Sequence, residues 1–196
     1  MSGDVVHSFT ATIPTWSPYV TPVELASATS EQLAAMKVTP SNKGVSPYVL
    51  TLAHDPESLA VRSPLFNLIM YGKDGLSPAE RELGALSASV VNRCIYCAAV
   101  HASRFISYSG RNDVVEEIFA DERDATLEAR QQALFNFATK LSTTPIEATA
   151  EDARALGEAG LSELEQLDLV LSAAIFGWAN RLMHTLGEPL ARSEAP

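Results

Sequence analysis

Cysteine is scarce in this chain, with two among 196 residues, so a framework of several disulfides is excluded. Basic residues are also few: 14 Lys and Arg stand against 24 Asp and Glu, a formal net charge of −10. An acidic surface repels phosphate backbones and anionic lipid headgroups, so neither nucleic acid nor a membrane surface is expected as a partner.

Long apolar runs are missing as well. The closest, residues 167–179, is interrupted by Asp168, Ser172 and Gly177 and is too short to cross a bilayer. The first residues, Met-Ser-Gly-Asp-Val-Val-His, lack the basic patch and apolar stretch of a secretory signal. We therefore expect a cytoplasmic protein, where thiols stay mostly reduced and a close cysteine pair is more often catalytic or metal-binding than structural.

Alternating apolar patterns typical of strands are not found, so we predict an all-α fold with no β-sheet. Residues 1–48 contain five prolines and read as an extended N-terminal arm, with one short helix near 30–36, that packs on the body or on another subunit or stays partly ordered. Residues 49–196 are expected to form one all-helical catalytic domain.

Capping signals place the helices of that domain. Ser77-Pro78-Ala79-Glu80 and Ser162-Glu163-Leu164-Glu165 are capping boxes that predict helices over about 78–91 and 163–186. Pro64 is expected to break or kink a helix that begins at Pro56, and Asn92 to cap the helix that carries both cysteines. Shorter helices fit 113–119, 126–141 and 149–158. The helix at 163–186 is apolar on nearly all sides in its centre, which predicts burial.

The two cysteines lie three residues apart, and a histidine follows, in the run Cys94-Ile-Tyr-Cys97-Ala-Ala-Val-His101. On an ideal helix these three side chains share one face, and the two cysteine Cα atoms are roughly 5 Å apart, within the range that a disulfide accepts. This arrangement indicates dithiol redox chemistry or a metal site. The helix N-terminus and Arg93 favour a thiolate at Cys94, whereas nearness to His101 favours Cys97.

A thiolate alone is a weak catalyst, because a more stable thiolate is also a poorer nucleophile. If the substrate is a peroxide, a proton donor for the leaving oxygen matters more, and His101 is the candidate. Glu82, on the preceding helix, is our choice for the carboxylate that orients His101, and small residues after it would let the two helices approach closely.

Together, Glu82, Cys94, Cys97 and His101 resemble the site of the alkylhydroperoxidase D-like (AhpD-like) family within the carboxymuconolactone decarboxylase superfamily. The later Trp178-Ala179-Asn180-Arg181 is similar to the peroxidase-related branch of that family. The resemblance implies a helical subunit that forms homo-oligomers, trimers or hexamers, and that reduces alkyl hydroperoxides for antioxidant defence. It also implies that Cys97 attacks the peroxide, that Cys94 resolves the sulfenic acid as a disulfide, and that Glu82 and His101 relay protons.

Tyr96 departs from that pattern, because the best-studied branch has a second histidine at this position. A tyrosine there suggests a shorter relay or a different reductant, and we take Tyr96 as a candidate substrate-binding residue that points away from Cys94. No bound cofactor is expected. The electrons are expected to come from an external dithiol carried by a reductase protein, of the lipoyl or thioredoxin-like kind.

Other functions remain open from the sequence. Cys94, Cys97, His101 and Glu82 could hold zinc, although two sulfurs one turn apart on a regular helix suit it poorly. A non-redox carboxymuconolactone decarboxylase-like enzyme would not need the cysteine pair. A thioredoxin-like fold would need a βαβ context, and a non-enzymatic protein could retain the motif.

Overall fold

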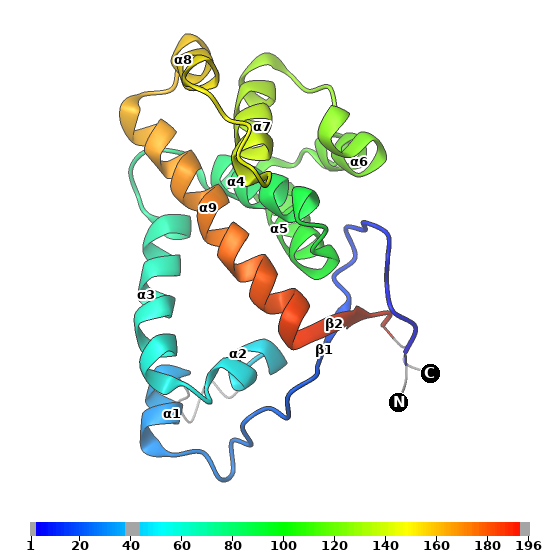
Figure 1. The fold of residues 1–196 in the computed structure, drawn as a ribbon, viewed down its shortest axis with the longest axis vertical. Helices are drawn as coiled ribbons and strands as arrows, with labels where there is room; N and C mark the ends of the chain where they lie inside the picture. The colour runs from blue at the N-terminus through cyan, green and yellow to red at the C-terminus, as the bar shows by residue number, and fades with distance from the viewer. Residues whose placement is uncertain (1–2, 38–43, 193–196) are drawn as a thin grey trace.

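The computed structural model describes residues 3–37 and 44–192, and these are mainly helical (Figure 1). In chain order the elements are β1 (Thr15–Pro18), α1 (Ser30–Ala35), α2 (Pro47–Leu52), α3 (Pro56–Tyr71), α4 (Pro78–Val91), α5 (Ile95–Ser109), α6 (Asn112–Asp121), a 3₁₀ turn (Glu122–Asp124), α7 (Ala129–Ser142), α8 (Ala150–Glu158), α9 (Glu163–Leu186) and β2 (Gly187–Leu190). The helices expected at 78–91 and 163–186 begin and end as predicted.

Helix α4 lies at the centre of the fold. Every residue from Arg81 to Val90 is buried, because α5, α7 and α9 pack around the helix. Gly84 allows α9 to pack closely against α4, because a Cβ at this position would lie 2.7 Å from the hydroxyl oxygen of Ser172 on α9. The small residues of α4 therefore bring it close to α9 as well as to α5.

A buried ion pair also joins α4 to α9. The Arg81 guanidinium lies 2.7 Å from the carboxylate of Asp168, and it donates further hydrogen bonds to the backbone carbonyls of Ile69 and Leu76. Asp168 in turn accepts a hydrogen bond from the Leu76 amide at 3.0 Å. The end of α3, the start of α4 and the first turns of α9 are thus held together at one point.

The prediction of a fold without β-sheet is wrong in one detail. Strands β1 and β2 form a two-stranded antiparallel sheet, with Thr15 opposite Leu190 and Pro18 opposite Gly187. The strands are 169 or more residues apart in sequence and are not joined by a tight turn, so the hairpin signals that a sequence can carry do not exist here.

The N-terminal arm packs on the helical body. Trp16 is buried and its indole N–H donates to the carbonyl oxygen of Met183, near the end of α9. Helices α1 and α2 pack with the first half of α3 in a small apolar cluster around Leu59. The division at residue 48 stays a prediction, since α2 spans that position.

The expected break at Pro64 does not occur, and α3 is one helix from Pro56 to Tyr71. Proline removes one backbone hydrogen bond and crowds the preceding turn. Buried residues anchor α3 on both sides of it: Leu59 lies in the cluster with α1 and α2, and Ile69 and Met70 belong to the main core. This packing keeps the two halves in one helix.

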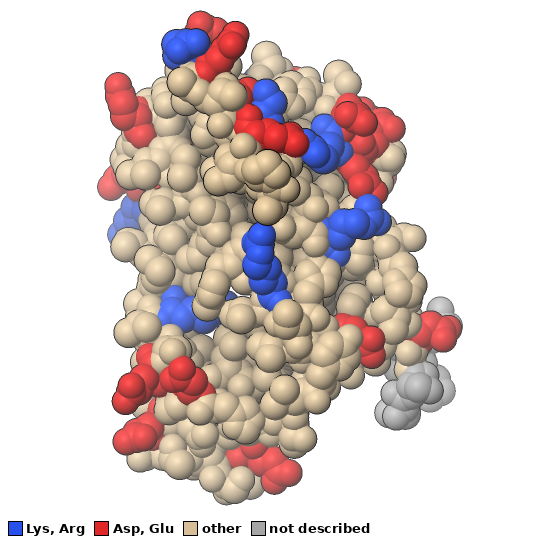
Figure 2. Space-filling view, in the orientation of Figure 1, with Lys and Arg blue, Asp and Glu red and all other residues tan. Residues whose placement is uncertain are grey.

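Helix α9 is buried on one side only, contrary to the expectation for its centre. Leu167, Leu171 and Trp178 are 53%, 39% and 47% exposed, and Val61, Leu65 and Leu68 of α3 are also exposed. We call these six residues the α3–α9 apolar face. Figure 2 shows that the middle of this side of the molecule carries few charged side chains. Among the described residues, no helix is long and apolar enough to cross a membrane.

Candidate active site

The cysteine pair lies at the turn that joins α4 to α5. Asn92, expected to start α5, instead ends α4, and its side-chain amide donates to the carbonyl oxygen of Ala88 at 2.8 Å. Arg93 has a positive φ of 52°, which reverses the chain direction so that Cys94 becomes the N-cap of α5. The helix itself begins at Ile95, so Cys94 lies just outside the regular geometry that we assumed.

Cys94 and Cys97 form a disulfide, with their Cα atoms 5.3 Å apart. This separation agrees with the value expected from the spacing. Both residues are buried, and they pack in a small cluster with Trp16 and Met183. The N-terminal arm and the end of α9 therefore cover the disulfide, through contacts between residues distant in the chain that the sequence analysis did not predict.

His101 and Glu82 lie together, as the sequence predicted. The Nδ1 atom of His101 is 2.5 Å from Oε2 of Glu82, and each residue is only 1% exposed. The edge of the His101 ring also packs against Phe176 of α9, with ring centroids 4.0 Å apart. These contacts fix the imidazole and leave its second nitrogen, Nε2, for other partners.

Arg104 extends this pair and was missed by the sequence analysis. Its Nη1 atom is 3.8 Å from Oε1 of Glu82 and donates a hydrogen bond to the Tyr71 hydroxyl at 3.0 Å. The available signal was its position three residues after His101, which places both side chains on one side of α5. Glu82 thus faces an imidazole and a guanidinium from the same helix.

One cavity, of about 470 Å³, is lined by both Cys97 and His101. Aromatic rings from four helices surround it, namely Tyr48, Phe66, Tyr71, Tyr96 and Phe176. We call it the Cys97 cavity. It is large enough for a small organic molecule and not only for hydrogen peroxide.

Arg62 brings a positive charge to the Cys97 cavity. Its guanidinium carbon lies 4.0 Å from the centre of the Phe66 ring and 5.6 Å from that of Tyr48. The Nε atom of Arg62 and the Tyr48 hydroxyl are buried without a hydrogen-bond partner among the described residues. Burial raises the pKa of Tyr48, while Arg62 acts to lower it, so the phenol stays protonated at neutral pH and can donate to a ligand.

Tyr96 packs against the cluster of Cys94, Cys97, Trp16 and Met183. The expectation that its side chain points away from Cys94 stays a prediction. Burial raises the pKa of Tyr96, so the phenol is not a base at neutral pH and cannot replace a histidine in that role.

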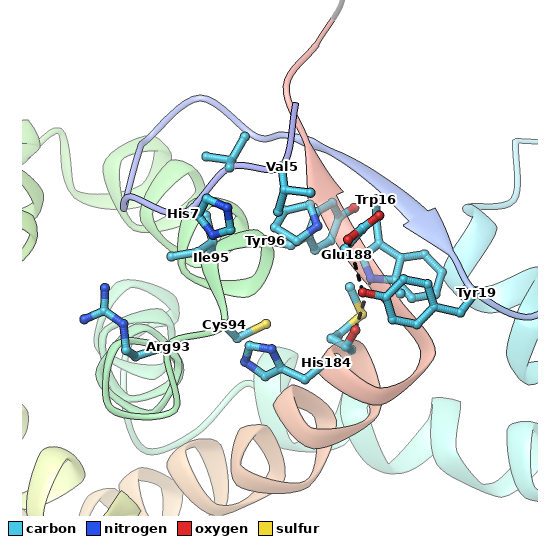
Figure 3. Close-up of a pocket in the computed structure, with 14 residues that line it drawn as sticks. Val5, His7, Trp16, Tyr19, Arg93, Cys94, Ile95, Tyr96, His184 and Glu188 are labelled. Atoms are coloured by element: carbon cyan, nitrogen blue, oxygen red, sulfur yellow. Dashed lines mark hydrogen bonds between the residues drawn. The ribbon is translucent and has the colours of Figure 1, made fainter. Parts of the chain in front are cut away.

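A second cavity, of about 340 Å³, is lined by Cys94 but not by Cys97. We call it the Cys94 cavity. Its walls come from the N-terminal arm, the start of α5, the end of α9 and β2, and Figure 3 shows the Cys94 sulfur directed into this space beside His184. The His184 Nε2 atom is 3.0 Å from the carbonyl oxygen of Asn92, which must accept, so Nε2 carries the proton.

Metal binding finds no geometric support in the part of the chain that the structure describes. It contains no group of three or more His, Cys, Asp or Glu side chains placed to hold a metal ion. Sulfur atoms joined in a disulfide are also not the thiolates that zinc requires.

Part of the chain matches a known protein family. Residues 56–140, which span α3 to most of α7, match the model of the carboxymuconolactone decarboxylase family. No curated protein matches the chain in sequence.

Several solved structures are similar over most of their length. A peroxidase-related protein with an alkylhydroperoxidase core from Ralstonia eutropha is 28% identical, with a TM-score of 0.73 over 88% of this chain and 90% of that one. A peroxidase-related protein from a Silicibacter species is 24% identical, with a TM-score of 0.72 over 89% and 95%. The debrominase Bmp8 is 21% identical, with a TM-score of 0.68 over 86% and 90%. The last two share the fold with this chain. In its central helices the chain is thus similar to the carboxymuconolactone decarboxylase family, and in its overall fold it is similar to AhpD-like proteins.

Proposed function

We propose that this protein is a dithiol-dependent reductase of alkyl hydroperoxides. The observation that carries the proposal is the Cys94–Cys97 pair beside His101, whose imidazole is held by the buried carboxylate of Glu82. A redox-active dithiol needs two close sulfurs, and peroxide cleavage benefits from a positioned proton donor.

In the proposed cycle the Cys97 thiolate attacks one peroxide oxygen. The O–O bond breaks, Cys97 becomes a sulfenic acid, and the leaving alkoxide takes a proton from His101. The Cys94 thiol then attacks the Cys97 sulfur, a disulfide forms, and water is released. An external dithiol returns two electrons and two protons and is itself oxidised to a disulfide. Such a donor is regenerated most readily in a reducing compartment, which suits a cytoplasmic location.

The aromatic walls of the Cys97 cavity favour an organic hydroperoxide. Packing an alkyl or aryl group of the substrate against these apolar rings removes it from water, which favours binding. Hydrogen peroxide has no apolar surface to bury. The Nε atom of Arg62 and the Tyr48 hydroxyl, which are buried and have no hydrogen-bond partner in the described part of the chain, could hold the peroxide oxygens or a polar group on the substrate.

The test is a titration of free thiols before and after one equivalent of cumene hydroperoxide, with mass analysis of the peptide that carries both cysteines. We expect the wild type to lose two thiols per subunit, Cys97→Ser to lose none, and Cys94→Ser to stop at a sulfenic acid. Equal behaviour of the wild type and both serine variants would remove the proposal.

A second candidate is reductive dehalogenation of an aromatic substrate. The aromatic lining of the Cys97 cavity favours it, and the structurally similar Bmp8 is named a debrominase, with a variant solved in complex with 2,3,4-tribromopyrrole. In this reaction the dithiol would supply two electrons, a hydrogen would replace the halogen, and halide would be released. Bromide release from 2,3,4-tribromopyrrole, without thiol loss to cumene hydroperoxide, would favour this reaction over peroxide reduction.

We also propose that the protein is a homo-oligomer, a trimer or a hexamer. The α3–α9 apolar face supports this, because three of its members, Val61, Leu65 and Trp178, line one surface pocket, and grouped exposed apolar side chains on a folded protein are typical of an interaction site.

A further inference from the structure

The two cysteines of the disulfide line different cavities. Cys97 lines the Cys97 cavity together with His101, and Cys94 lines the Cys94 cavity together with His184. Tyr96 and Met183 line both, so these two side chains and the disulfide separate the cavities. A molecule in one cavity can reach one sulfur without displacing a molecule in the other.

We propose that the Cys94 cavity is the binding site of the dithiol reductant, separate from the Cys97 cavity that takes the hydroperoxide. This inference rests on the proposed function. It assigns roles to a group of residues outside the sequence motif, most of them from the N-terminal arm, the end of α9 and β2 (Figure 3).

The chemistry favours attack at Cys94. An incoming thiolate forms a bond to the Cys94 sulfur, the disulfide bond breaks, and Cys97 leaves as a thiolate beside His101, which can donate a proton to it. The second thiolate of the reductant then attacks the reductant's own bound sulfur and releases Cys94. The reductant ends as a disulfide, two electrons pass to the protein, and each cysteine regains a proton. A thiolate that is better stabilised leaves faster. Because His101 lies beside Cys97, the Cys97 thiolate is the better leaving group of the two.

The shape of the site defines the class of reductant. Cys94 is only 3% exposed, and its sulfur is reached through a cavity walled by separate segments of the chain. A cysteine on the flat surface of a folded domain cannot approach a sulfur at this depth, whereas a slender alkyl dithiol can. Because Nε2 of His184 donates to the Asn92 carbonyl, Nδ1 is the acceptor nitrogen of the ring and can take the proton of the incoming thiol.

One experiment uses the wild-type protein without substitution. The oxidised protein is treated with 2-mercaptoethanol. Because this reagent has a single thiol, it forms a mixed disulfide with the protein and is not rapidly released from it. The remaining thiols are then alkylated with iodoacetamide. Cleavage after Arg93 and Arg104 gives one peptide with both cysteines, and fragment ions locate each group. We expect the mercaptoethanol adduct on Cys94 and the alkyl group on Cys97. The opposite distribution, or an equal one, would overturn the proposal.

A second experiment uses variants and measures two reactions separately: reduction of the disulfide and oxidation of the two thiols. His7 is exposed and lines the Cys94 cavity, and the neighbouring Ser8 is exposed but lines neither cavity. We expect His7→Trp to slow reduction of the disulfide by dithiothreitol at least roughly ten-fold through obstruction, and Ser8→Trp to leave it unchanged. Asn67→Trp, at the exposed edge of the Cys97 cavity, should slow oxidation by cumene hydroperoxide and not reduction.

The results separate this inference from the proposed function. Protein oxidised with diamide tests the reduction step even if no hydroperoxide oxidises the wild type, an outcome that would end the peroxidase proposal alone. Equal reduction rates in His7→Trp and Ser8→Trp, with both variants folded by circular dichroism, would reject the Cys94 cavity as the reductant site.

Discussion

At the scale of single residues, the site depends on polar groups that are removed from water and therefore need partners. Glu82 is buried and has an imidazole on one oxygen and a guanidinium 3.8 Å from the other. Such a carboxylate is stabilised only while these cations or donors remain in place. We therefore regard Glu82 as a positioning residue that acts through His101.

The first prediction concerns the coupling of these two residues. We expect His101→Gln to slow thiol oxidation by cumene hydroperoxide on the order of 10²- to 10⁴-fold, the usual contribution of a general acid. Glu82→Gln should slow it less, and should add little when His101 is already replaced, because it acts through the imidazole. Stopped-flow measurement of the oxidation rate in the wild type, the two single variants and the double variant gives the coupling between the two residues directly.

His54→Gln is the matched control, since His54 is exposed and lines neither cavity. Additive effects of the two active-site substitutions would show that Glu82 does not act through His101.

At the scale of secondary-structure elements, α4 holds the fold together because its neighbours are attached to it by buried polar contacts as well as by apolar packing. The Arg81–Asp168 pair links it to α9, and Arg130 of α7 links the first turns of α4 and α9 through Glu80 and Glu165. The two links differ in burial, so they should differ in strength and in their response to pH.

The second prediction is that Asp168→Asn destabilises the protein by about 3–5 kcal/mol, since it leaves the buried Arg81 guanidinium without its counter-charge. Urea unfolding followed by circular dichroism measures this change. Asp124→Asn, at an exposed position in the 3₁₀ turn, should change the free energy of unfolding by less than about 0.5 kcal/mol. Similar effects of the two substitutions would contradict the assigned role of the ion pair.

The third prediction concerns pH. Burial acts to raise the pKa of Glu80, but hydrogen bonds from Arg130 and Ser77 outweigh it and hold the pKa below its ordinary value. Hydrogen bonds from the backbone and side chain of Ser162, and then from Arg130, also lower the pKa of Glu165. A carboxyl group with a lowered pKa stabilises the folded state above its unfolded pKa, and this contribution is lost as the pH falls through the folded value.

Arg130→Gln should therefore destabilise the protein most near neutral pH, by at most about 1 kcal/mol for these partly exposed pairs. The difference in the free energy of unfolding between this variant and the wild type should shrink as the pH falls below about 4.3, the pKa of a glutamate in an unfolded chain. Urea unfolding at pH 7, 5 and 3.5 measures it, and a difference that grows toward low pH would contradict the assignment.

At the scale of the whole molecule, the disulfide is covered whereas a group of apolar side chains is exposed. The N-terminal arm and β2 close one side of the disulfide, while the α3–α9 apolar face remains open on the helical body. If subunits associate through that face, the Cys97 cavity, which includes Arg62 and Phe66 of α3, lies near the interface.

The fourth prediction is that a charge on this face dissociates the oligomer. Leu68 is 71% exposed, and Leu68→Glu should shift the mass measured by light scattering toward the monomer, because a buried unpaired carboxylate opposes association. Ile146→Glu is the control, since Ile146 is 64% exposed and lies in the loop between α7 and α8. A wild-type protein that is monomeric at micromolar concentration would contradict the oligomer proposal.

The helical body and the members of the motif could be predicted from the sequence alone. Capping boxes and proline positions are local signals, so the starts of α4, α8 and α9 could be read directly. The closeness of Cys94, at the N-cap of α5, to Cys97 also follows from local geometry, and the placement of Glu82 on the neighbouring helix beside His101 was correct.

Only the tertiary structure decided which groups surround that motif. The pairing of β1 with β2, the cover that Trp16 provides and the continuity of α3 through Pro64 depend on contacts between residues distant in the chain. The same is true of Arg62 and Tyr48 at the Cys97 cavity and of His184 at the Cys94 cavity. Periodicity and capping report on a few neighbouring residues, whereas a cavity is enclosed by side chains whose only relation is that the folded chain brings them together.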